Sequence, residues 1–593
     1  MEDVIDSIDS LADFCPKQWP DVAWHRDHVE AAVHEALRRL AQRLHNSARS
    51  EGILPASVSI DCEGSALVLR EPDVEPRRFR NFAEVVVHLS VCCDVEVKTE
   101  ISKELMHCLA SEALSILYCR FLWPFRGHGS AQKLWDAVGR DVQTLESLAI
   151  LEQVSAFAGH PTHPMWKTRS PLTFKETCTF APEFASPVVP ILVAARTRLM
   201  TIFPSITEWR ALWEKEFPLA VELMAENIAS EVLHEYAPLF LHPLNEQSLK
   251  ERFAAAFASE DLLLIPQQAY QCRPTLSFRT LSMSDSFHVK LPVPVQSTSW
   301  PRYVSPVEVH ESAIVTELLK QMQLPTDLVV LEERFACHAT FGDKFSYRDC
   351  SYCSMILRES PLAVMRSECR IFLLAALFAP GGDNEPALWQ MLWDQHGLKE
   401  EKLTSWFRCY AAKVIGIQIS FFLRYGFTIE AHQQNTMLEF DRSGQLARLL
   451  YKEIGGGIEI DAERLEAFPD LDFSAKLYPQ QDMIVAVSQC IALLRHSMLE
   501  SHLLPLGRLA AKSSALPLDG FISTIREEIK QAIADSVQAP GDTWSDERFR
   551  AYGAGLASKL LDEPECTHKA LLRMRLAGSK DYVFTQTPNP CCR

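Results

Sequence analysis

The sequence predicts an α+β protein made of three successive parts, and three observations support this class. Residues with helical periodicity dominate both ends of the chain, whereas the middle is rich in proline and in short alternating segments typical of strands. A chain of 593 residues also exceeds what one hydrophobic core usually serves. We therefore place the parts at residues 1–158, 159–386 and 387–593.

The bulk composition excludes several classes of protein. A formal net charge of −18 argues against a nucleic-acid-binding protein, although a local basic pocket could still take a small anion. The start, MEDVIDSIDSLADF, lacks the features of a secretory signal, and the longest apolar run (371–379) is too short to span a bilayer. The 17 cysteines show no disulfide framework, which favours free thiols. We expect a cytoplasmic protein that binds neither nucleic acid nor membrane.

The first part reads as a mixed unit of helices and strands. Residues 27–44 carry an apolar face at helical spacing, and further helices are expected at about 100–120 and 130–157. VSIDCEGSALVLRE (58–71) predicts a hairpin that turns at Glu63-Gly64, and FAEVVVHLSV (82–91) predicts another strand.

The other two parts are separated by a segment rich in turn formers. LSFRTL (276–281) and HVKLPVPVQSTS (288–299) predict strands in the middle part. APGGDNEP (379–386) is the expected linker, and LTSWFRCYAAKVIGIQISFFLRYG (403–426) predicts a long helix after it.

The stretch EAHQQNTMLEFDRSGQLARLLYKEIGGG (430–457) has the order of a nucleotide site. A polar loop is followed by a hairpin across DRSG, and the second strand runs into an acid and three glycines. In kinase-like folds a loop Asn and an acid after such a hairpin hold Mg²⁺, which prefers oxygen ligands. Glu430, Asn435 and Glu453 are the candidate metal ligands. A surface hairpin with ordinary polar residues is the alternative.

A second cluster, at residues 274–302, suits a polyanion. Ser277 and Arg279 alternate along a predicted strand, so that both side chains could point to one face. Arginine offers a planar bidentate fork and lysine a point charge for anionic groups. The remaining members are Lys290, Thr298 and Arg302. A solvated sheet face is the alternative.

The segment GHPTHPMWKTR (159–169) predicts a rigid extended loop, because its two prolines exclude an interior helical turn. Its candidate ligand groups are His163, Lys167 and Arg169. Zinc binding by His160 and His163 is the less favoured interpretation, because such a pair usually lies on a helix with further ligands nearby. A single CxxC, Cys350 to Cys353, and the terminal Cys591-Cys592 are weak metal signals.

Together, these three segments resemble the siderophore synthetases that work without a peptide-synthetase template (NRPS-independent, or NIS), the aerobactin-synthetase-like IucA/IucC family. GHPTHPMWKTR, SFRTL with KLPVPVQSTSWPR, and EAHQQNTML occur in the family's order, and the resemblance covers about residues 150–593. The chain departs from the family at two places. Lys452-Glu453 replaces an Arg-Asp pair, and Ser170-Pro171 replaces the Gly that ends the first motif.

The resemblance implies a cupped-hand fold of thumb, fingers and palm, with a kinase-like Mg²⁺-ATP end in the palm, and usually a homodimer. It implies ATP-dependent adenylation of a carboxylate, most often citrate, and condensation with an amine or alcohol, which releases AMP and pyrophosphate. By this resemblance the ATP-binding residues are His163, Lys167, Ser277, Arg279 and Lys290. The carboxylate-binding residues are Thr298, Arg302 and His432, and the catalytic residues are Arg302, His432 and Lys290. Glu430, Asn435 and Glu453 fall on the Mg²⁺ side.

Three other functions remain open from the sequence. A kinase-like phosphotransferase would share the Mg²⁺-ATP end but would produce ADP. A non-enzymatic iron-reductase-like module would use the terminal cysteines. A degenerate family member without catalysis is suggested by Lys452-Glu453. The sequence identifies neither the acid nor the nucleophile.

Overall fold

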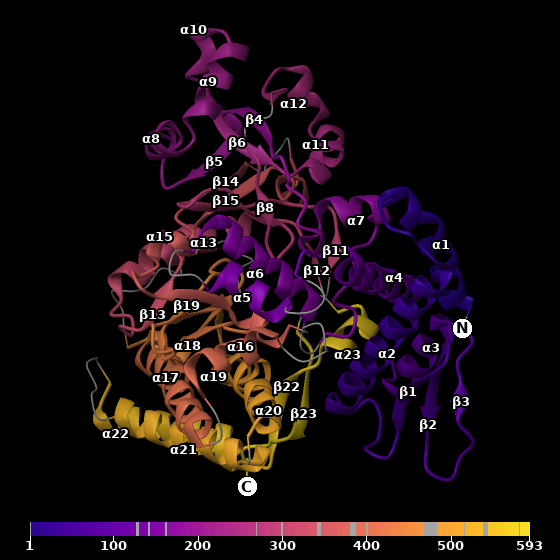
Figure 1. Cartoon of the computed structure of the whole chain (residues 1–593). Helices are drawn as coiled ribbons and strands as arrows, with labels where there is room; N and C mark the ends of the chain where they lie inside the picture. The colour runs from indigo at the N-terminus through magenta and orange to yellow at the C-terminus, as the bar shows by residue number, and fades with distance from the viewer. Residues whose placement is uncertain are drawn as a thin grey trace.

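The computed structural model shows a mixed α+β protein whose N-terminal, middle and C-terminal regions occupy different sides of the molecule (Figure 1). It describes residues 2–592 apart from 126–129, 140–142, 161–162, 268–269, 298–299, 341–344, 380–386, 399–400, 468–482, 515, 538–543 and 580–581. The expected linker at 379–386 lies, except for Ala379, outside these residues. None of the described helices is long and apolar enough to cross a membrane.

The N-terminal region packs helices against a three-stranded antiparallel sheet of order β1-β2-β3. The hairpin expected at 58–71 is confirmed, with Glu63 opposite Ala66 at its turn. The elements are α1 (Glu2–Gln18), α2 (Arg26–Ser50), β1 (Ser59–Glu63), β2 (Ala66–Arg70), β3 (Arg77–Arg78), α3 (Phe82–Cys92) and α4 (Glu100–Phe121).

The expected strand at 82–91 is wrong, because these residues form helix α3. The side chain of Asn81 accepts a hydrogen bond from the amide of Glu84 (3.0 Å) and so caps the helix. The buried positions are Phe82, Val85, Val86 and Leu89. That spacing is helical, and it outweighs the strand preference of the β-branched residues.

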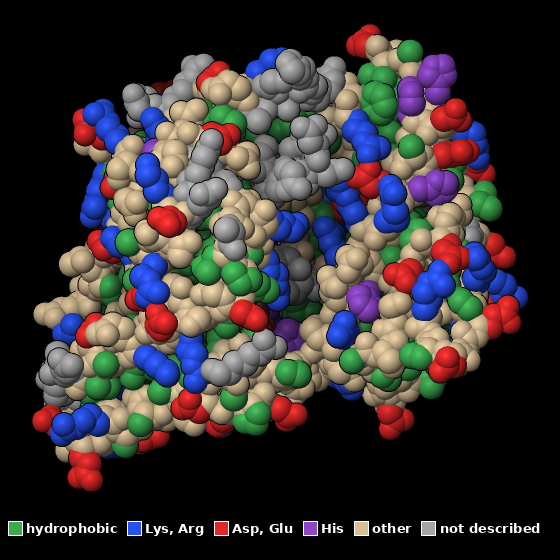
Figure 2. All heavy atoms as spheres, turned by 60° about the horizontal axis from the view of Figure 1, so that its bottom comes forward, with side chains coloured by type: hydrophobic (Ala, Val, Ile, Leu, Met, Phe, Trp, Pro, Cys, Tyr) green, Lys and Arg blue, Asp and Glu red, His purple; other side chains and the backbone are tan. Residues whose placement is uncertain are grey.

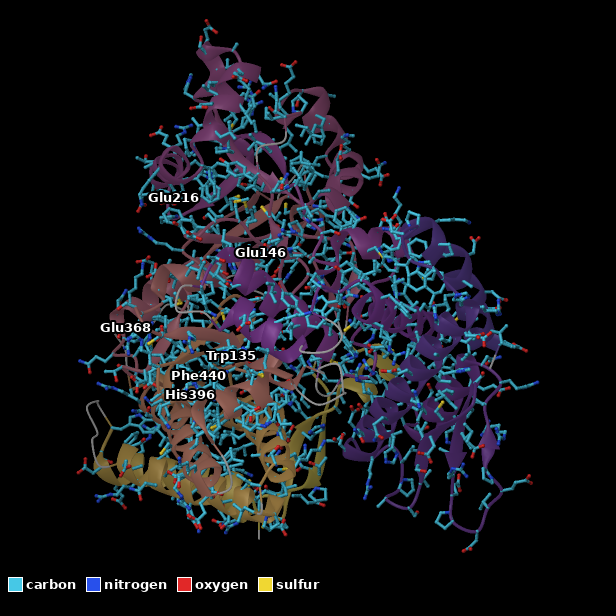
Figure 3. All side chains as sticks on the ribbon, in the orientation of Figure 1. Trp135, Glu146, Glu216, Glu368, His396 and Phe440 are labelled. Carbon is cyan, nitrogen blue, oxygen red and sulfur yellow. The ribbon has the colours of Figure 1, made fainter. Side chains whose placement is uncertain are left out.

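Helices α5 (Ser130–Val138) and α6 (Leu145–Ala158) belong to the core of the C-terminal region. The Trp135 ring of α5 stacks on Phe372 (centroids 5.7 Å apart), which in turn contacts Phe440. Figure 3 labels Trp135 and Phe440, the two ends of this chain of rings. The buried apolar residues of 123–157 therefore pack with the C-terminal core, and not with the core of the preceding residues in the expected first part, 1–158.

Conversely, a helix near the end of the sequence packs into the core of the N-terminal region. Helix α23 (Leu571–Ala577) buries Leu572 and Leu576 in the N-terminal core. The carboxylate of Glu51, at the end of α2, accepts hydrogen bonds from the amides of Leu572 (2.8 Å) and Arg573 (2.6 Å). The N-terminal and C-terminal regions are thus joined by a buried helix cap.

The middle region contains a three-stranded sheet of order β6-β4-β7 and a six-stranded sheet of order β5-β14-β15-β10-β9-β8. Its helices are α7 (Phe174–Phe180), α8 (Ile206–Glu216), α9 (Pro218–Asn227), α10 (Ser230–Leu233), α11 (Glu246–Arg252), α12 (Ala254–Ala258), α13 (Pro306–Gln321), α14 (Tyr347–Cys350) and α15 (Pro361–Val364). Its strands are β4 (Ile191–Arg196), β5 (Met200–Phe203), β6 (Tyr236–Leu241), β7 (Leu262–Ile265), β8 (Arg273–Pro274), β9 (Thr280–Ser282), β10 (Phe287–Lys290), β11 (Gln296–Ser297), β12 (Trp300–Pro301), β13 (Leu328–Val330), β14 (Phe335–Ala339), β15 (Ser354–Glu359) and β16 (Arg370–Leu373).

The two strands expected around residues 276–299 are shorter than predicted. Residues 276–279 form a turn before β9, with Phe278 at φ 69°, so Ser277 and Arg279 do not alternate along a strand. A left-handed conformation is uncommon for a bulky residue such as phenylalanine. The segment 288–299 divides into β10 and β11 because residues 291–295 leave the sheet.

The C-terminal region is built around a four-stranded sheet of order β13-β19-β18-β16. The hairpin expected across DRSG is confirmed as β18 and β19, with Thr436 opposite Tyr451. The long helix expected at 403–426 is confirmed as α17. The elements are α16 (Ala387–His396), α17 (Glu401–Tyr425), β17 (Phe427–Ile429), β18 (Thr436–Phe440), β19 (Leu446–Tyr451), β20 (Ile458–Asp461), α18 (Ala462–Leu465), β21 (Ile484–Val485), α19 (Val487–Arg495), a π-helix (His496–Leu503), α20 (Leu504–Lys512), α21 (Leu518–Ser536), α22 (Asp546–Ala557), β22 (Glu565–Lys569), α23 and β23 (Phe584–Pro588).

Candidate active site

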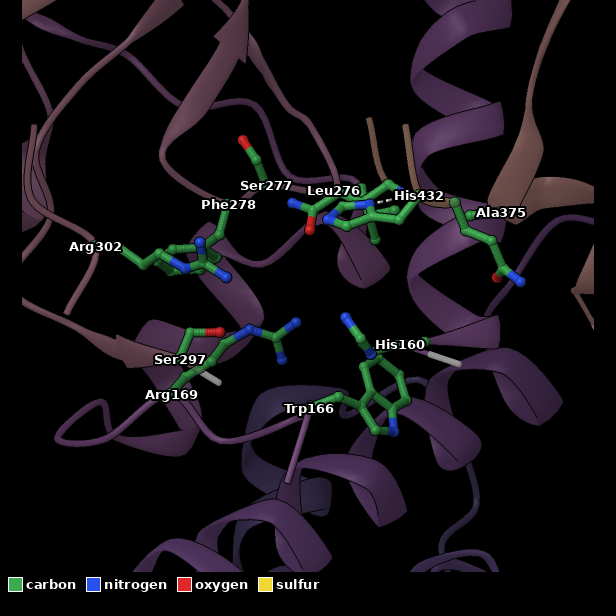
Figure 4. Close-up of a pocket in the computed structure, with 13 residues that line it drawn as sticks. His160, Trp166, Arg169, Leu276, Ser277, Phe278, Ser297, Arg302, Ala375 and His432 are labelled. Carbon is green, nitrogen blue, oxygen red and sulfur yellow. Dashed lines mark hydrogen bonds between the residues drawn. The ribbon is translucent and has the colours of Figure 1, made fainter. Parts of the chain in front are cut away.

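One cavity brings together residues from all three predicted segments. It is partly open to solvent. Its lining residues are Gly159, His160, Trp166, Arg169, Leu276, Ser277, Phe278, Ser297, Arg302, Ala375, His432, Gln433 and Gln434. Figure 4 shows the Arg169, Arg302, His160 and Trp166 side chains directed into this space, which we call the acid pocket. On the outside of the molecule, Lys and Arg side chains gather along a hollow between two halves of the surface (Figure 2).

The loop that opens the pocket depends on glycine at position 159. Helix α6 ends at Ala158, and Gly159 follows with φ 82°. A Cβ at Gly159 would lie 2.3 Å from the Trp166 ring, so a larger residue would displace that ring. The Arg43 guanidinium (4.6 Å) and the Lys167 ammonium (4.1 Å) lie near the centroid of the same ring. Pro161 and Thr162 lie outside the described residues.

Backbone amides of this loop set the tautomers of its two histidines. The amide of His163 donates to Nδ1 of His160 (3.0 Å), and the amide of Met165 donates to Nδ1 of His163 (3.1 Å). Each neutral ring therefore carries its proton on Nε2. Burial and nearby cations lower the pKa of His163 to about 3, so this ring is neutral at physiological pH.

His163 keeps a donor for a ligand, although it does not line the acid pocket. Its Nε2 atom is buried and has no hydrogen-bond partner among the described residues. An unsatisfied buried donor is costly, which favours a role for this atom in binding. The expected contact of His163 with phosphate stays a prediction.

Lys167 lies away from the pocket. Its Nζ atom donates to Ser115 Oγ (3.0 Å), to the carbonyl of Ala156 (2.9 Å) and to Glu183, and its side chain is fully buried. All three ammonium hydrogens are thus taken by protein groups. This placement favours a structural role and argues against the expected contact of Lys167 with ATP.

Arg279 and Lys290 lie in a network of alternating charges that we call the buried ion-pair lattice. Its members are Arg279, Lys290, Arg358, Glu308, Glu333 and Glu453. Glu308 accepts from Arg279 Nη2 (2.6 Å) and lies 2.7 Å from Lys290 Nζ. Glu453 pairs with Lys290 and with Arg358 Nη2 (2.7 Å).

The lattice is electrically balanced, because three cations face three carboxylates. The cations around Glu453, led by Lys290, hold the pKa of its carboxyl well below the usual range against the effect of burial. Ser277, by contrast, lines the acid pocket. The turn at 276–279 therefore sends Ser277 and Arg279 to different surroundings.

The glycines after the hairpin let the chain pass close to helix α13. A Cβ at Gly455 would lie 2.5 Å from Ser312 Oγ and 2.6 Å from the Glu308 carbonyl oxygen. The amide of Gly455 donates to Glu333 (3.2 Å) and that of Gly456 to Glu311 (2.7 Å). This close passage holds Glu453 beside the lattice cations.

The structure places Glu430 and Asn435 together, as expected for a shared site. The Asn435 side-chain amide donates to the backbone carbonyl of Glu430 (3.2 Å). The Glu430 carboxylate pairs with Lys569 Nζ (2.7 Å), and despite burial its pKa is lowered to about 2, chiefly by that charge. Lys569 was missed by the sequence analysis, because it lies in the C-terminal hairpin 139 residues away without a motif around it.

Arg302 and His432 both line the acid pocket, whereas Thr298 lies outside the described residues. Burial, followed by the charge of Arg279, lowers the pKa of Arg302 to about 10, so it stays protonated at neutral pH. Burial lowers the pKa of His432 to about 4. The amide of Gln434 donates to His432 Nδ1 (3.2 Å), which leaves Nε2–H as the ring's donor.

Lys452, one of the two residues that depart from the family pattern at 452–453, forms a buried ion pair. Lys452 Nζ pairs with Glu152 Oε1 of helix α6 (3.0 Å), and Glu152 Oε2 accepts from the amide of Leu276 (2.7 Å). Lys452 thereby ties the second hairpin strand to the turn that carries Ser277. At the other departure, Ser170 pairs with Gln296, next to the pocket residue Ser297.

Comparison with known proteins agrees with this arrangement. Residues 147–379 match the IucA / IucC family, and residues 404–583 match a family described as ferric iron reductase FhuF-like transporter. Staphyloferrin A synthase of Staphylococcus aureus is 25% identical over 446 residues, which cover 73% of this chain and 71% of that protein. The D-ornithine–citrate ligase of the same organism is 21% identical and covers 76% and 71%. These matches support the IucA/IucC family of NIS siderophore synthetases as the family of this chain.

Solved structures share the fold of this IucA/IucC-family synthetase. The petrobactin biosynthesis protein AsbB from Bacillus anthracis gives a TM-score of 0.75 at 16% identity and covers 96% of this chain and 98% of its own. ATP-bound aerobactin synthetase IucA from Klebsiella pneumoniae gives 0.67 at 15% identity and covers 93% and 99%. The expected α+β class and the expected ligase family are confirmed.

All 17 cysteines are free thiols, as predicted, including the terminal Cys591-Cys592 pair.

Proposed function

We propose that this synthetase activates a polycarboxylate with ATP and condenses it with an amine or alcohol, releasing AMP and pyrophosphate. The observation that carries the proposal is the acid pocket, where two arginines face one cavity next to the lattice that contains Arg279 and Lys290. Citrate is the leading candidate acid, because relatives are named D-ornithine–citrate ligase and L-2,3-diaminopropanoate–citrate ligase.

The chemistry requires two anions to meet, and the site supplies the charge for it. A substrate carboxylate oxygen attacks the α-phosphorus of ATP, the bond to the β-phosphate oxygen breaks, and pyrophosphate leaves. Arg302 would orient the carboxylate, and His432, neutral and protonated on Nε2, would donate to it. Ser277, Arg279 and Lys290 would bind the phosphates.

The second step consumes the acyl adenylate. The amine or alcohol attacks the activated carbonyl carbon, AMP leaves, and the nucleophile loses a proton as the amide or ester forms. Because adenylation precedes this attack, the acid pocket should lie beside the phosphate-binding cations and not be enclosed by them. The nucleophile must still reach the carbonyl carbon after pyrophosphate has left.

The donor set of Glu430, Asn435 and Glu453 fits Mg²⁺, because carboxylate and amide oxygens are its preferred ligands. Bound Mg²⁺ would neutralise phosphate charge during attack. In this structure Glu430 and Glu453 are each paired with a lysine. We infer that nucleotide binding exchanges these partners, with phosphate taking the place of Glu453 at Lys290.

We extend the proposal to the finer architecture and the setting of the enzyme. The three regions would form the thumb, fingers and palm of a cupped hand, with a kinase-like Mg²⁺-ATP end around the β18–β19 hairpin. We propose a homodimer that works in the cytoplasm, because siderophore assembly uses cellular ATP and small acids. Gel filtration and cell fractionation test these two points.

Product analysis tests the proposed function directly. The enzyme is incubated with ATP, Mg²⁺ and a panel of acids and amines, and AMP, ADP and pyrophosphate are quantified together with the mass of the condensed product. AMP and pyrophosphate that depend on a polycarboxylate support the proposal. ADP would indicate a phosphotransferase instead, and no nucleotide turnover with any acid would indicate a degenerate member.

A further inference from the structure

Arg169 shares the acid pocket with Arg302, but it is not among the ATP-, carboxylate- or Mg²⁺-binding residues that the resemblance implies. Both residues line the cavity, and Figure 4 shows both guanidinium groups directed into it. Arg169 is held in place by Glu183, because its Nη2 atom donates to both carboxylate oxygens (2.7 and 2.9 Å). Among the described residues, the hydrogen bonds made by this guanidinium fall on Nη2 alone, so Nη1 and Nε remain as donors.

The charge around Glu183 leaves a surplus at Arg169. Glu183 is fully buried, and Arg169 and Lys167 lower its pKa to about 2 despite burial, so it carries one negative charge at neutral pH. That single charge is shared by Lys167 and Arg169. Lys167 has all its hydrogens taken by protein atoms. The uncompensated positive charge therefore belongs to the cation that lines the cavity.

The rest of the lining carries no negative charge to cancel this surplus. The lining residues from the described chain include no aspartate or glutamate, and their remaining polar groups are neutral serine, glutamine and histidine side chains. Two guanidinium groups with this lining suit a molecule that carries at least two carboxylates, because Arg302 can orient one carboxylate and Arg169 can donate charge-assisted hydrogen bonds to another from Nη1 or Nε.

We propose that Arg169 is a specificity-determining residue that binds a second carboxylate of the acid, one that is not adenylated. This inference rests on the proposed function, in which Arg302 orients the carboxylate that reacts. Glu183 is a positioning residue for Arg169, because it engages Nη2 and leaves the Nη1 and Nε hydrogens to the substrate. The pocket would thereby distinguish polycarboxylates from monocarboxylates.

The test compares Arg169→Gln and Arg169→Lys with the wild type, using citrate, tricarballylate and acetate as acids. Charge-assisted hydrogen bonds are strong enough that Arg169→Gln should raise KM for citrate and tricarballylate about ten- to hundredfold. KM for ATP should change less than about twofold, and the weak use of acetate should not change. Arg169→Lys should recover only part of the loss, because one ammonium nitrogen keeps the charge but cannot donate to Glu183 and to the substrate in the directions of the separate guanidinium nitrogens.

Arg43→Gln is the matched control. Arg43 lies over the same loop, 4.6 Å from the Trp166 ring centroid, but it does not line the cavity. A merely structural effect on the loop would appear in this variant too, whereas loss of a carboxylate contact would not. Equal effects of Arg43→Gln and Arg169→Gln on KM for citrate would overturn the inference.

Calorimetry separates failure of this inference from failure of the proposed function. Wild type should bind citrate without ATP, and Arg169→Gln should bind it at least tenfold more weakly. If wild type binds citrate but releases no pyrophosphate, the proposed function fails. The inference about Arg169 is then still decided by comparing citrate binding in wild type and in Arg169→Gln. Unchanged citrate binding in Arg169→Gln, or weakened ATP binding with normal citrate binding, would contradict the inference. So would a wild type that binds neither polycarboxylate.

Discussion

The acid pocket and the buried ion-pair lattice are both rich in cations, yet they differ in how their charge is compensated. In the lattice three cations face three carboxylates, whereas the pocket residue Arg169 shares one carboxylate with Lys167. A balanced network must give up an internal partner before it binds a new anion, and a region with surplus charge need not. We therefore expect the acid to bind without a rearrangement of ion pairs. Binding of the nucleotide should require such a rearrangement in the lattice.

The largest effect is expected from Lys290→Ala, which breaks the lattice at its centre. Lys290 contacts both Glu308 and Glu453, so its loss leaves two buried carboxylates short of a partner. Pyrophosphate release should fall by roughly a hundred- to a thousandfold, and the free energy of unfolding should fall by about 3–5 kcal/mol. Turnover assays and urea denaturation measure the two effects. Lys320→Ala is the control, because its ion pairs are exposed and should matter little.

Glu453→Ala tests whether the lattice gives up this carboxylate to Mg²⁺. Pyrophosphate release should fall by roughly a hundredfold at limiting Mg²⁺, while citrate binding by calorimetry should stay within about twofold, because Glu453 does not line the acid pocket. Asn435→Ala should behave similarly with a smaller loss. Full turnover of both variants at limiting Mg²⁺ would refute the metal assignment.

Arg302→Ala addresses the other side of the comparison. Use of the acid should weaken by about one to two orders of magnitude, since a charge-assisted contact contributes roughly 1.5–3 kcal/mol. Arg302→Lys should restore only part of this, and ATP affinity should change little. Separate titrations with ATP and with citrate measure the division. A variant that loses ATP but keeps citrate would place Arg302 on the phosphate side.

A change of pH is expected to have the smallest effect on activity. Its effect on the free energy of unfolding should differ between His432 in the acid pocket and Glu453 in the lattice. Folding lowers the pKa of His432 from 6.5 to about 4, so the unfolded chain binds the extra proton first and stability falls as pH drops below about 6.5. Between pH 7 and pH 5 the titration of this one histidine should lower the free energy of unfolding by about 2 kcal/mol. The lattice acid Glu453, with its lowered pKa, should contribute no loss in this window.

His432→Gln is the variant that isolates this histidine. Its melting temperature should fall less than that of the wild type between pH 7 and pH 5, because glutamine does not titrate. Identical pH profiles for the two proteins would show that His432 is not the group responsible.

Local patterns predicted the parts of the site better than they predicted its contacts. The DRSG hairpin was predictable because turn chemistry acts within a few residues. Helix α3 was missed because its β-branched residues favour a strand, and only the spacing of its buried positions indicates a helix.

The partners of the charged residues could not be read from the sequence. Lys290 meets Glu453 across 163 residues, and Glu430 meets Lys569 across 139. No local rule indicates that the cation beside a motif acid comes from a strand or hairpin so far away. For the same reason the burial of Lys167 against Ser115 and Glu183 became visible only in three dimensions.

The cap that Glu51 places on helix α23 has a consequence for how the protein is made. The N-terminal core takes in Leu572 and Leu576, and Leu572 follows its partner Glu51 by 521 residues, so a ribosome must synthesise that whole stretch before the core is complete. Until then the apolar faces of the first helices stay partly uncovered, a state in which chaperones bind and aggregation begins. Once α23 docks, the same contact ties Lys569, two residues earlier, to its place beside Glu430. Completion of the N-terminal core and placement of Lys569 beside Glu430 are therefore coupled.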